Sequence, residues 1–345
     1  LLRFGSMSDD LMEKEKLSTY LLKQGFIYQL LLSALFIFVS FFFINKYEDI
    51  FYIFLLFTIR LIGFYFLNHI QSQFRIFGNN RGFARITNIV NLSGVVLLLV
   101  LSYYFGLKGY LIAIAVTPFI AFLWFKKEYL NSVGENFNFS KKEIWNYGFH
   151  AAGTALLSDT LFSADVLMLS FLMNETAVAN YKVAILIPAN ITFLALTFMQ
   201  SDFPVLAKNY RNRNFLTSYI TNYYKIFIPI SLLIFLVGLI FKTEILYLFF
   251  RERYADNSWV FVILLAGFSL NMLFRNLYGN LLSAVGMMKM NTAISILTLV
   301  MLVLFSFVFV KKFGIEGMAF SLTLSMFIGG FLLLFSFYLY WKDLK

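Results

Sequence analysis

The sequence contains no cysteine and only two histidines, and each shortage excludes a class of chemistry. Without cysteine there is no thiol nucleophile, no disulfide framework and no thiolate metal site. His69 and His150 are too few to build a multi-histidine site within one chain. The GxxxxGK[ST] phosphate-binding loop is also absent, so nothing indicates nucleotide hydrolysis. We therefore expect a non-enzymatic protein with no catalytic residues, no metal site and no cofactor.

Charge is scarce as well, at 13% of residues, whereas 60% of residues are hydrophobic. Soluble globular chains carry about 45–50% apolar and about 25% charged residues. The apolar residues here form long runs such as 26–44, which contains no charge. A helix needs about 20 such residues to cross a bilayer, whereas barrel strands alternate over about 10. The composition predicts an all-α polytopic membrane protein.

The hydropathy pattern predicts ten membrane helices separated by short polar links. An additional interfacial helix is predicted over 207–222, which mixes basic and aromatic residues. The ten spans are 26–44, 50–68, 84–105, 109–125, 146–172, 177–204, 223–241, 258–283, 290–310 and 316–341.

The cations divide unequally between the two sides of these spans. With Arg3 placed inside, inside segments carry 18 Lys and Arg and outside segments carry 7. Cytoplasmic loops are the ones enriched in these residues. We therefore expect both visible ends, including the C-terminus, in the cytoplasm, and we interpret the net charge of +10 as a sign of orientation rather than of nucleic-acid binding.

An internal repeat relates the two halves of the chain. Gly78 pairs with Gly286, and the block 105–109 (Phe-Gly-Leu-Lys-Gly) pairs with 313–317 (Phe-Gly-Ile-Glu-Gly), each at an offset of 208 positions. An even number of predicted helices separates the matched segments, so both halves share one orientation. Duplicated halves are a recurring transporter design, with the substrate site between them. The sequence predicts two pseudo-symmetric helical bundles.

The same offset bears on the start of the chain. Residue 1 corresponds to residue 209, and two predicted helices of the second half, 146–172 and 177–204, precede that point. The chain also begins Leu-Leu-Arg. We expect ten helices of a complete twelve. The predicted domains are an N-terminal bundle lacking its first two helices, a cytoplasmic linker and a C-terminal six-helix bundle, over 1–126, 127–145 and 146–345.

Three segments together resemble a known transporter family. One is Asp165-Val-Leu-Met-Leu-Ser-Phe-Leu, which is followed by Glu175 and by Asn180-Tyr181-Lys182. Another is Phe203-Pro204-Val205-Leu206, and the third is the repeated glycine block. Their order and spacing are similar to those of the polysaccharide (O-antigen type) flippase family, within the multidrug/oligosaccharidyl-lipid/polysaccharide exporter superfamily. The resemblance covers most of residues 1–341.

The resemblance implies a function in polysaccharide and lipopolysaccharide biosynthesis at the bacterial inner membrane. Members of this family move a lipid-linked oligosaccharide from the cytoplasmic to the outer leaflet by exposing a cationic cavity to each side in turn. The cargo of this class carries a negatively charged pyrophosphate. The resemblance also implies contact with membrane lipids and association with a polysaccharide polymerase and glycosyltransferases.

Three cations fall inside predicted spans, where charge is expensive and usually faces a bundle interior or a wet cavity. They are Arg60, Lys182 and Arg275, which we predict to bind the substrate because arginine pairs well with phosphate. The alternative is snorkelling of long side chains to the interface, which suits Lys182 best.

Two carboxylates in the span 146–172 are candidates for coupling transport to a proton or sodium gradient. Asp159 and Asp165 are six residues apart, so they point about 120° apart around a helix. They do not form a metal-binding pair on one face. An ion pair with a cation of another helix is the alternative for Asp159.

Two further readings remain open at this point. One is a related exporter of peptidoglycan precursor or of drugs, although a drug-cation exporter should prefer anionic cavity residues. The other is an integral membrane polysaccharide polymerase, which should carry a large extracytoplasmic loop. The longest outside link here, 241–259, is short.

Overall fold

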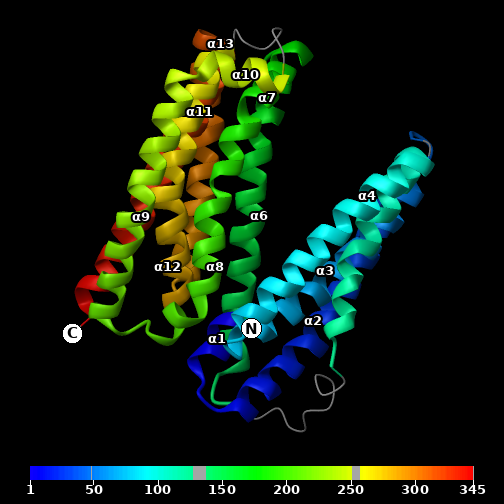
Figure 1. Cartoon of the computed structure of the whole chain (residues 1–345), viewed down its shortest axis with the longest axis vertical. Helices are drawn as coiled ribbons and strands as arrows, with labels where there is room; N and C mark the ends of the chain where they lie inside the picture. Colours follow the sequence, from blue (N-terminus) through cyan, green and yellow to red (C-terminus); the bar gives the residue numbers. More distant parts are fainter. Residues whose placement is uncertain (48, 127–136, 251–256, 345) are drawn as a thin grey trace. The chain divides into compact units, whose positions relative to one another are not determined.

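The computed structural model describes residues 1–47, 49–126, 137–250 and 257–344, and these contain helices and no strand (Figure 1). Two compact units divide the chain, Leu1–Ser140 and Lys141–Lys345. Residues 127–136 of the predicted linker lie outside the described residues. Unit 1 contains α1 (Leu2–Met7), α2 (Leu11–Ser40), α3 (Ile50–Ile76), α4 (Asn80–Val116) and the 3-10 turn η1 (Thr117–Trp124).

Unit 2 is entirely helical over its described residues and contains one π-helical turn, η3. Its elements are α6 (Lys141–Leu172), α7 (Glu175–Ile191), α8 (Phe193–Lys208), α9 (Arg213–Ile240), α10 (Lys242–Phe250), α11 (Ser258–Asn271), η3 (Met272–Asn276), α12 (Leu277–Val285) and α13 (Met288–Asp343).

Eight helical stretches in the described residues are long and apolar enough to cross a membrane. Two of them contain a sharp break, at Gly106 in α4 and at Gly314 in α13. Each break divides its stretch into two spans, so the stretches supply the ten spans that hydropathy predicts. The predicted fold class, an all-α polytopic membrane protein, is confirmed.

The internal repeat is present in the backbone conformation. Gly106 has φ 55° and ψ −134°, and Gly314 has φ 57° and ψ −132°. Gly78 and Gly286, also 208 positions apart, both adopt positive φ. Residues with a Cβ disfavour this region, so glycine is required at each turn. The sequence match between the halves therefore marks two equivalent places where the chain reverses between spans.

Two predicted boundaries are wrong. The first long helix begins at Leu11 rather than at residue 26, because Asp10 caps it by accepting a hydrogen bond from the Met12 amide at 2.9 Å. The predicted interfacial helix 207–222 does not exist as a separate element. Instead, Asn212 caps α9 through the Phe215 amide at 3.0 Å, and α9 runs unbroken from Arg213.

Unit 1 is organised around α3, which contacts α1, α2, α4 and η1. Its core consists of Leu67 and Ile70 of α3 against Ile86, Val90 and Ala121. The Tyr65 hydroxyl reaches α2 and donates to the carbonyls of Leu21 and Leu22. This donation gives α2 and α3 a polar connection within an otherwise apolar interface.

Unit 2 is organised around α11, whose span is 67% buried, against 33% or less for every other described span. It packs on α7, α9 and α13. Glycine permits a close approach here, because a Cβ on Gly267 would lie 2.3 Å from the Thr323 hydroxyl. The same hydroxyl donates to the Ile263 carbonyl at 3.0 Å. Small residues at helix contacts are typical of membrane bundles.

The second glycine of each repeated block makes the break possible. A Cβ on Gly109 would lie 1.9 Å from the Leu101 carbonyl oxygen, and one on Gly317 would lie 2.1 Å from that of Phe309. Both obstacles are backbone atoms, which cannot move aside cheaply. We expect Gly109→Ala and Gly317→Ala each to destabilise the protein by about 1–3 kcal/mol, measured as a lower midpoint of thermal unfolding in detergent.

Gly148 of α6 is the matched control, because a Cβ there meets nothing within 4 Å. Alanine also favours a helix interior over glycine, so Gly148→Ala should leave the midpoint unchanged or raise it. Equal midpoints for all three variants would contradict the role given to the repeated glycines.

Candidate functional site

Arg275 lies in the π-helical turn η3, deep in the span 258–285. Its side chain is 9% exposed, and its Nη2 donates to the Ser158 hydroxyl of α6 at 3.0 Å. The Phe162 ring, one turn further along α6, lies 5.9 Å from the guanidinium. At the start of the turn, the Tyr223 hydroxyl of α9 donates to the Met272 carbonyl at 2.8 Å. The side chain of Arg275 is therefore held by α6, and the turn that carries it is held by α9.

No carboxylate neutralises Arg275 among the described residues; its polar contact there is a neutral hydroxyl. A buried charge without a counter-ion is strongly unfavourable in the membrane. Guanidinium carries five donors in a planar fork, so most of its hydrogen-bonding capacity stays unused by Ser158. The arrangement can accept an anion such as a phosphate.

Three asparagines near Arg275 carry unused polar atoms. Asn271 is 1% exposed, and its Nδ2 lies 3.4 Å from Asn276 Oδ1. The Oδ1 of Asn271 and the Nδ2 atoms of Asn276 and Asn280 are buried without a partner in the described chain. Sequence reasoning missed these amides, although three asparagines within ten residues of an apolar span were a usable signal. Together with Arg275 they could bind a polar cargo.

Asp159 directly follows Ser158 in α6, and its side chain is exposed on the surface of unit 2. Thr160 and Ser163 are exposed too, and their hydroxyls donate back to the carbonyls of Leu156 and Asp159. The Asp159 carboxylate makes no ion pair among the described residues, so the alternative of a partnered Asp159 finds no support within unit 2. This stretch of α6 is polar where a lipid-facing helix would be apolar.

Asp165 is fully buried, in contrast to Asp159. Its carboxylate accepts hydrogen bonds from the Val166 amide at 2.6 Å and from the Tyr181 hydroxyl of α7 at 3.0 Å. Tyr181 is also fully buried, and Lys182, the next residue, is exposed. The structure thus brings Asp165 and the neighbourhood of Lys182 together, and it keeps the two carboxylates in different surroundings.

Arg60 lies on α3 in unit 1, and it is half-buried. Its guanidinium carbon lies 5.2 Å from the Phe64 ring centre and 6.0 Å from that of Phe57. In the described residues it forms neither a hydrogen bond nor an ion pair. Its contacts are therefore with aromatic faces, which attract a cation but leave its donors free.

Within the described residues, no three or more Asp, Glu or His side chains cluster so that they could hold a metal ion. The candidate site therefore consists of Arg275, Ser158 and the buried amides, with the polar face of α6 beside them.

No family model matches the sequence, and no curated protein matches it either. Among solved structures, the chain is similar to the Vibrio cholerae MATE transporter VcmN in a mutant form, with a TM-score of 0.77 and 16% identity over 99% of this chain and 84% of that one. It is similar to an outward-facing multidrug resistance MATE family transporter of the MOP superfamily, with a TM-score of 0.76 and 17% identity over 100% and 84%. It is also similar to the inward closed lipid II flippase MurJ, with a TM-score of 0.63 and 17% identity over 97% and 75%. The chain therefore has the fold shared by these transporters and this flippase.

Proposed function

We propose that this protein is a flippase of the polysaccharide (O-antigen type) family, which moves a lipid-linked oligosaccharide from the cytoplasmic to the outer leaflet of the bacterial inner membrane. The observation that carries the proposal is Arg275, a buried membrane cation with a hydroxyl partner and no counter-ion in the described chain. An anionic group on the cargo would supply the missing counter-ion. A polyprenyl-linked pyrophosphate is such a group.

Alternating access would expose the site to each side of the membrane in turn, and it sets a limit on affinity. A cargo held by many charge pairs would not leave. Arg275 is partly engaged by Ser158, so its hold on a phosphate would be moderate. The polar amides Asn271, Asn276 and Asn280 could contact sugar hydroxyls without adding charge.

Export of peptidoglycan precursor is the nearest alternative, since one similar structure is a lipid II flippase. A peptidoglycan precursor differs from the proposed cargo in its sugar, and the same cations could bind its phosphate groups. Drug export is less favoured because the buried charge at the site, Arg275, is positive. A polymerase is disfavoured because the longest outside link, 241–259, is too short for a separate catalytic domain, and α10 (Lys242–Phe250) takes up part of it.

The cation prediction is tested in a bacterium deleted for its own flippase, by expressing the complete gene and measuring surface polysaccharide at matched membrane abundance. Loss of a charge-assisted hydrogen bond is worth about 1.5–3 kcal/mol, so Arg275→Ala and Arg60→Ala should each lower transport about tenfold or more. Arg275→Lys should retain part of the activity, because lysine keeps the charge but loses the planar fork.

Arg85→Ala is the matched control, since Arg85 is exposed near the start of α4, away from the middle of the span. It should transport like the wild type. Full transport by Arg275→Ala and Arg60→Ala would remove the site assignment while leaving the flippase. If the wild type fails to restore polysaccharide across a panel of hosts with different sugars, the flippase itself is wrong.

We propose that the carboxylates Asp159 and Asp165 couple transport to a proton or sodium gradient. They differ in how much each contributes to the stability of the fold. Asp159→Asn should lower transport several-fold without changing the thermal midpoint, because its side chain makes no contact that the fold needs. Asp165→Asn should lower both the transport and the thermal midpoint, because Asp165 is buried against Tyr181. Selective collapse of each gradient with ionophores then identifies the ion.

Asp343→Asn, at the exposed end of α13, is the control for both carboxylate variants and should behave as the wild type. Transport by Asp159→Asn and Asp165→Asn that keeps the wild-type sensitivity to both ionophores would exclude these residues from coupling.

The proposed orientation places the C-terminus in the cytoplasm, and single cysteines introduced into these 345 residues, which contain none, test it. Lys289 and Lys312 are exposed residues of α13 on opposite sides of one predicted span. In intact cells a membrane-impermeant maleimide should label Lys312→Cys and should label Lys289→Cys only after lysis. The reverse pattern would invert the topology.

A further inference from the structure

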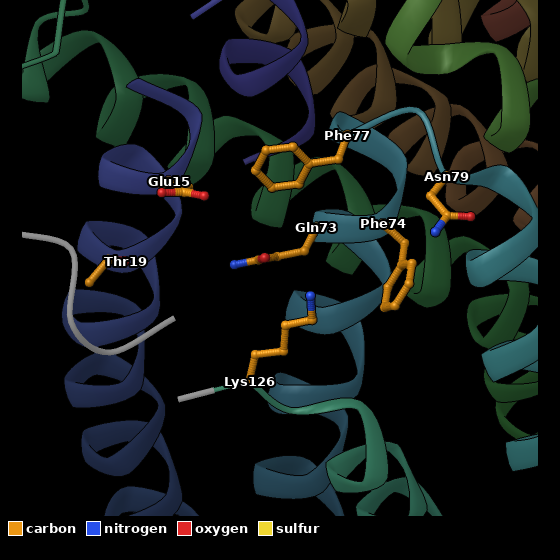
Figure 2. A pocket seen from close by; sticks show the side chains of 7 residues that line it. All are labelled: Glu15, Thr19, Gln73, Phe74, Phe77, Asn79 and Lys126. Atoms are coloured by element: carbon orange, nitrogen blue, oxygen red, sulfur yellow. The ribbon is translucent and has the colours of Figure 1, made fainter. Parts of the chain in front are cut away.

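A small cavity of about 240 Å³ lies at one end of unit 1, where α2 begins, α3 ends and the chain leaves η1 (Figure 2). None of Arg60, Lys182 and Arg275 lines it. We propose that this cavity binds an ammonium–phosphate zwitterion, the phosphoethanolamine head group. The lining side chains are Glu15, Thr19, Gln73, Phe74, Phe77, Asn79 and Lys126.

Gln73 is the fixed polar element of the cavity. It is 3% exposed, and its Nε2 donates to the Ser18 hydroxyl of α2 and lies 3.3 Å from His69 Nε2. Ser18 Oγ also lies 3.1 Å from that same ring nitrogen. These contacts engage the amide nitrogen and leave the Gln73 carbonyl oxygen without a partner in the described chain. The cavity therefore contains a preorganised acceptor for an ammonium N–H.

Two opposite charges stand on different walls of the cavity. Glu15 comes from α2 and Lys126 from the segment after η1, and the Lys126 ammonium points toward Gln73 (Figure 2). Neither side chain forms an ion pair or hydrogen bond with the described residues, including with each other. A purely anionic ligand would meet Glu15, and a purely cationic one would meet Lys126. A ligand with both charges satisfies the two walls at once.

The rest of the lining fits a head group attached to an apolar body. Phe74 and Phe77 supply aromatic surface beside the charges. Outside the lining, the Lys14 ammonium donates to the Ile76 carbonyl at 3.0 Å and lies 6.0 Å from the Phe77 ring centre, so a further positive charge stands beside this aromatic side chain. Drug-sized ligands occupy about 300–1,000 Å³. The smaller volume here suits a head group whose chains remain outside.

The test is native mass spectrometry of the purified protein in detergent, titrated with phosphatidylethanolamine, phosphatidylcholine and phosphatidylglycerol of identical chains. The ammonium of ethanolamine can donate to Glu15 and Gln73, whereas the trimethylated choline cannot. One lost charge-assisted hydrogen bond corresponds to about tenfold in affinity. The first phosphatidylethanolamine should therefore bind about tenfold more tightly than either other lipid.

Glu15→Gln and Lys126→Gln should each abolish this preference, and Glu15→Lys should shift it toward phosphatidylglycerol. Lys23→Gln, which removes an exposed cation of α2 outside the cavity, is the control and should keep it. Soluble phosphoethanolamine distinguishes the source of the zwitterion: binding as tight as that of the lipid assigns a free metabolite, and weaker binding assigns the lipid. Equal affinity for the three lipids, or a preference that survives Glu15→Gln and Lys126→Gln, would overturn the proposal.

Discussion

Hydrocarbon offers no hydrogen-bond partners, and this constraint governs every element of the structure. The backbone satisfies it by remaining helical. Many hydroxyls satisfy it locally by donating to the carbonyl one turn back, as Thr58 does to Phe54 and Ser306 to Leu302, at 2.8 and 2.6 Å. Such residues need nothing from neighbouring helices. Side chains that cannot bond to their own helix in this way therefore indicate where a partner or a ligand is needed. Arg275 is the clearest case among the described residues, because one hydroxyl partner leaves most donors of its guanidinium unused.

The repeat explains how one simple pattern yields two compact units. Positive φ at Gly78 and Gly286, and the almost identical breaks at Gly106 and Gly314, direct the chain between spans at equivalent places. Backbone geometry is thus what the duplication preserves. Each break also needs a glycine three residues later, because the incoming and outgoing spans approach so closely that a Cβ would collide with a carbonyl.

Much of this was predictable from the sequence because it depends on local properties. Apolar runs predicted ten spans, and glycine pairs predicted where the halves correspond. The start of α2 was not predictable from hydropathy, because a cap at Asp10 extends the helix through polar residues beyond the apolar run. Within the candidate site, position in a span drew attention to Arg275, whose role in binding cargo stays a prediction, but its partner Ser158 lies 117 positions away in the sequence. Pairings of that kind depend on helix packing, as does the bond of Tyr181 to Asp165. No periodicity in one sequence specifies them.

Arg60 and Arg275 do not occupy equivalent positions of the repeat, and this bears on how a duplicated fold could bind a cargo whose two ends differ. At the offset of 208, Arg60 corresponds to Phe268 and Arg275 corresponds to Leu67. Phe268 and Leu67 are both buried core residues of their units. The arginine of each unit therefore corresponds to a buried core residue of the other unit. The cargo proposed above, a lipid-linked sugar, has one charged end, and duplicated charges would offer it two competing poses. Charges at non-equivalent positions favour a single pose, while the equivalent breaks at Gly106 and Gly314 keep the same backbone path within each unit.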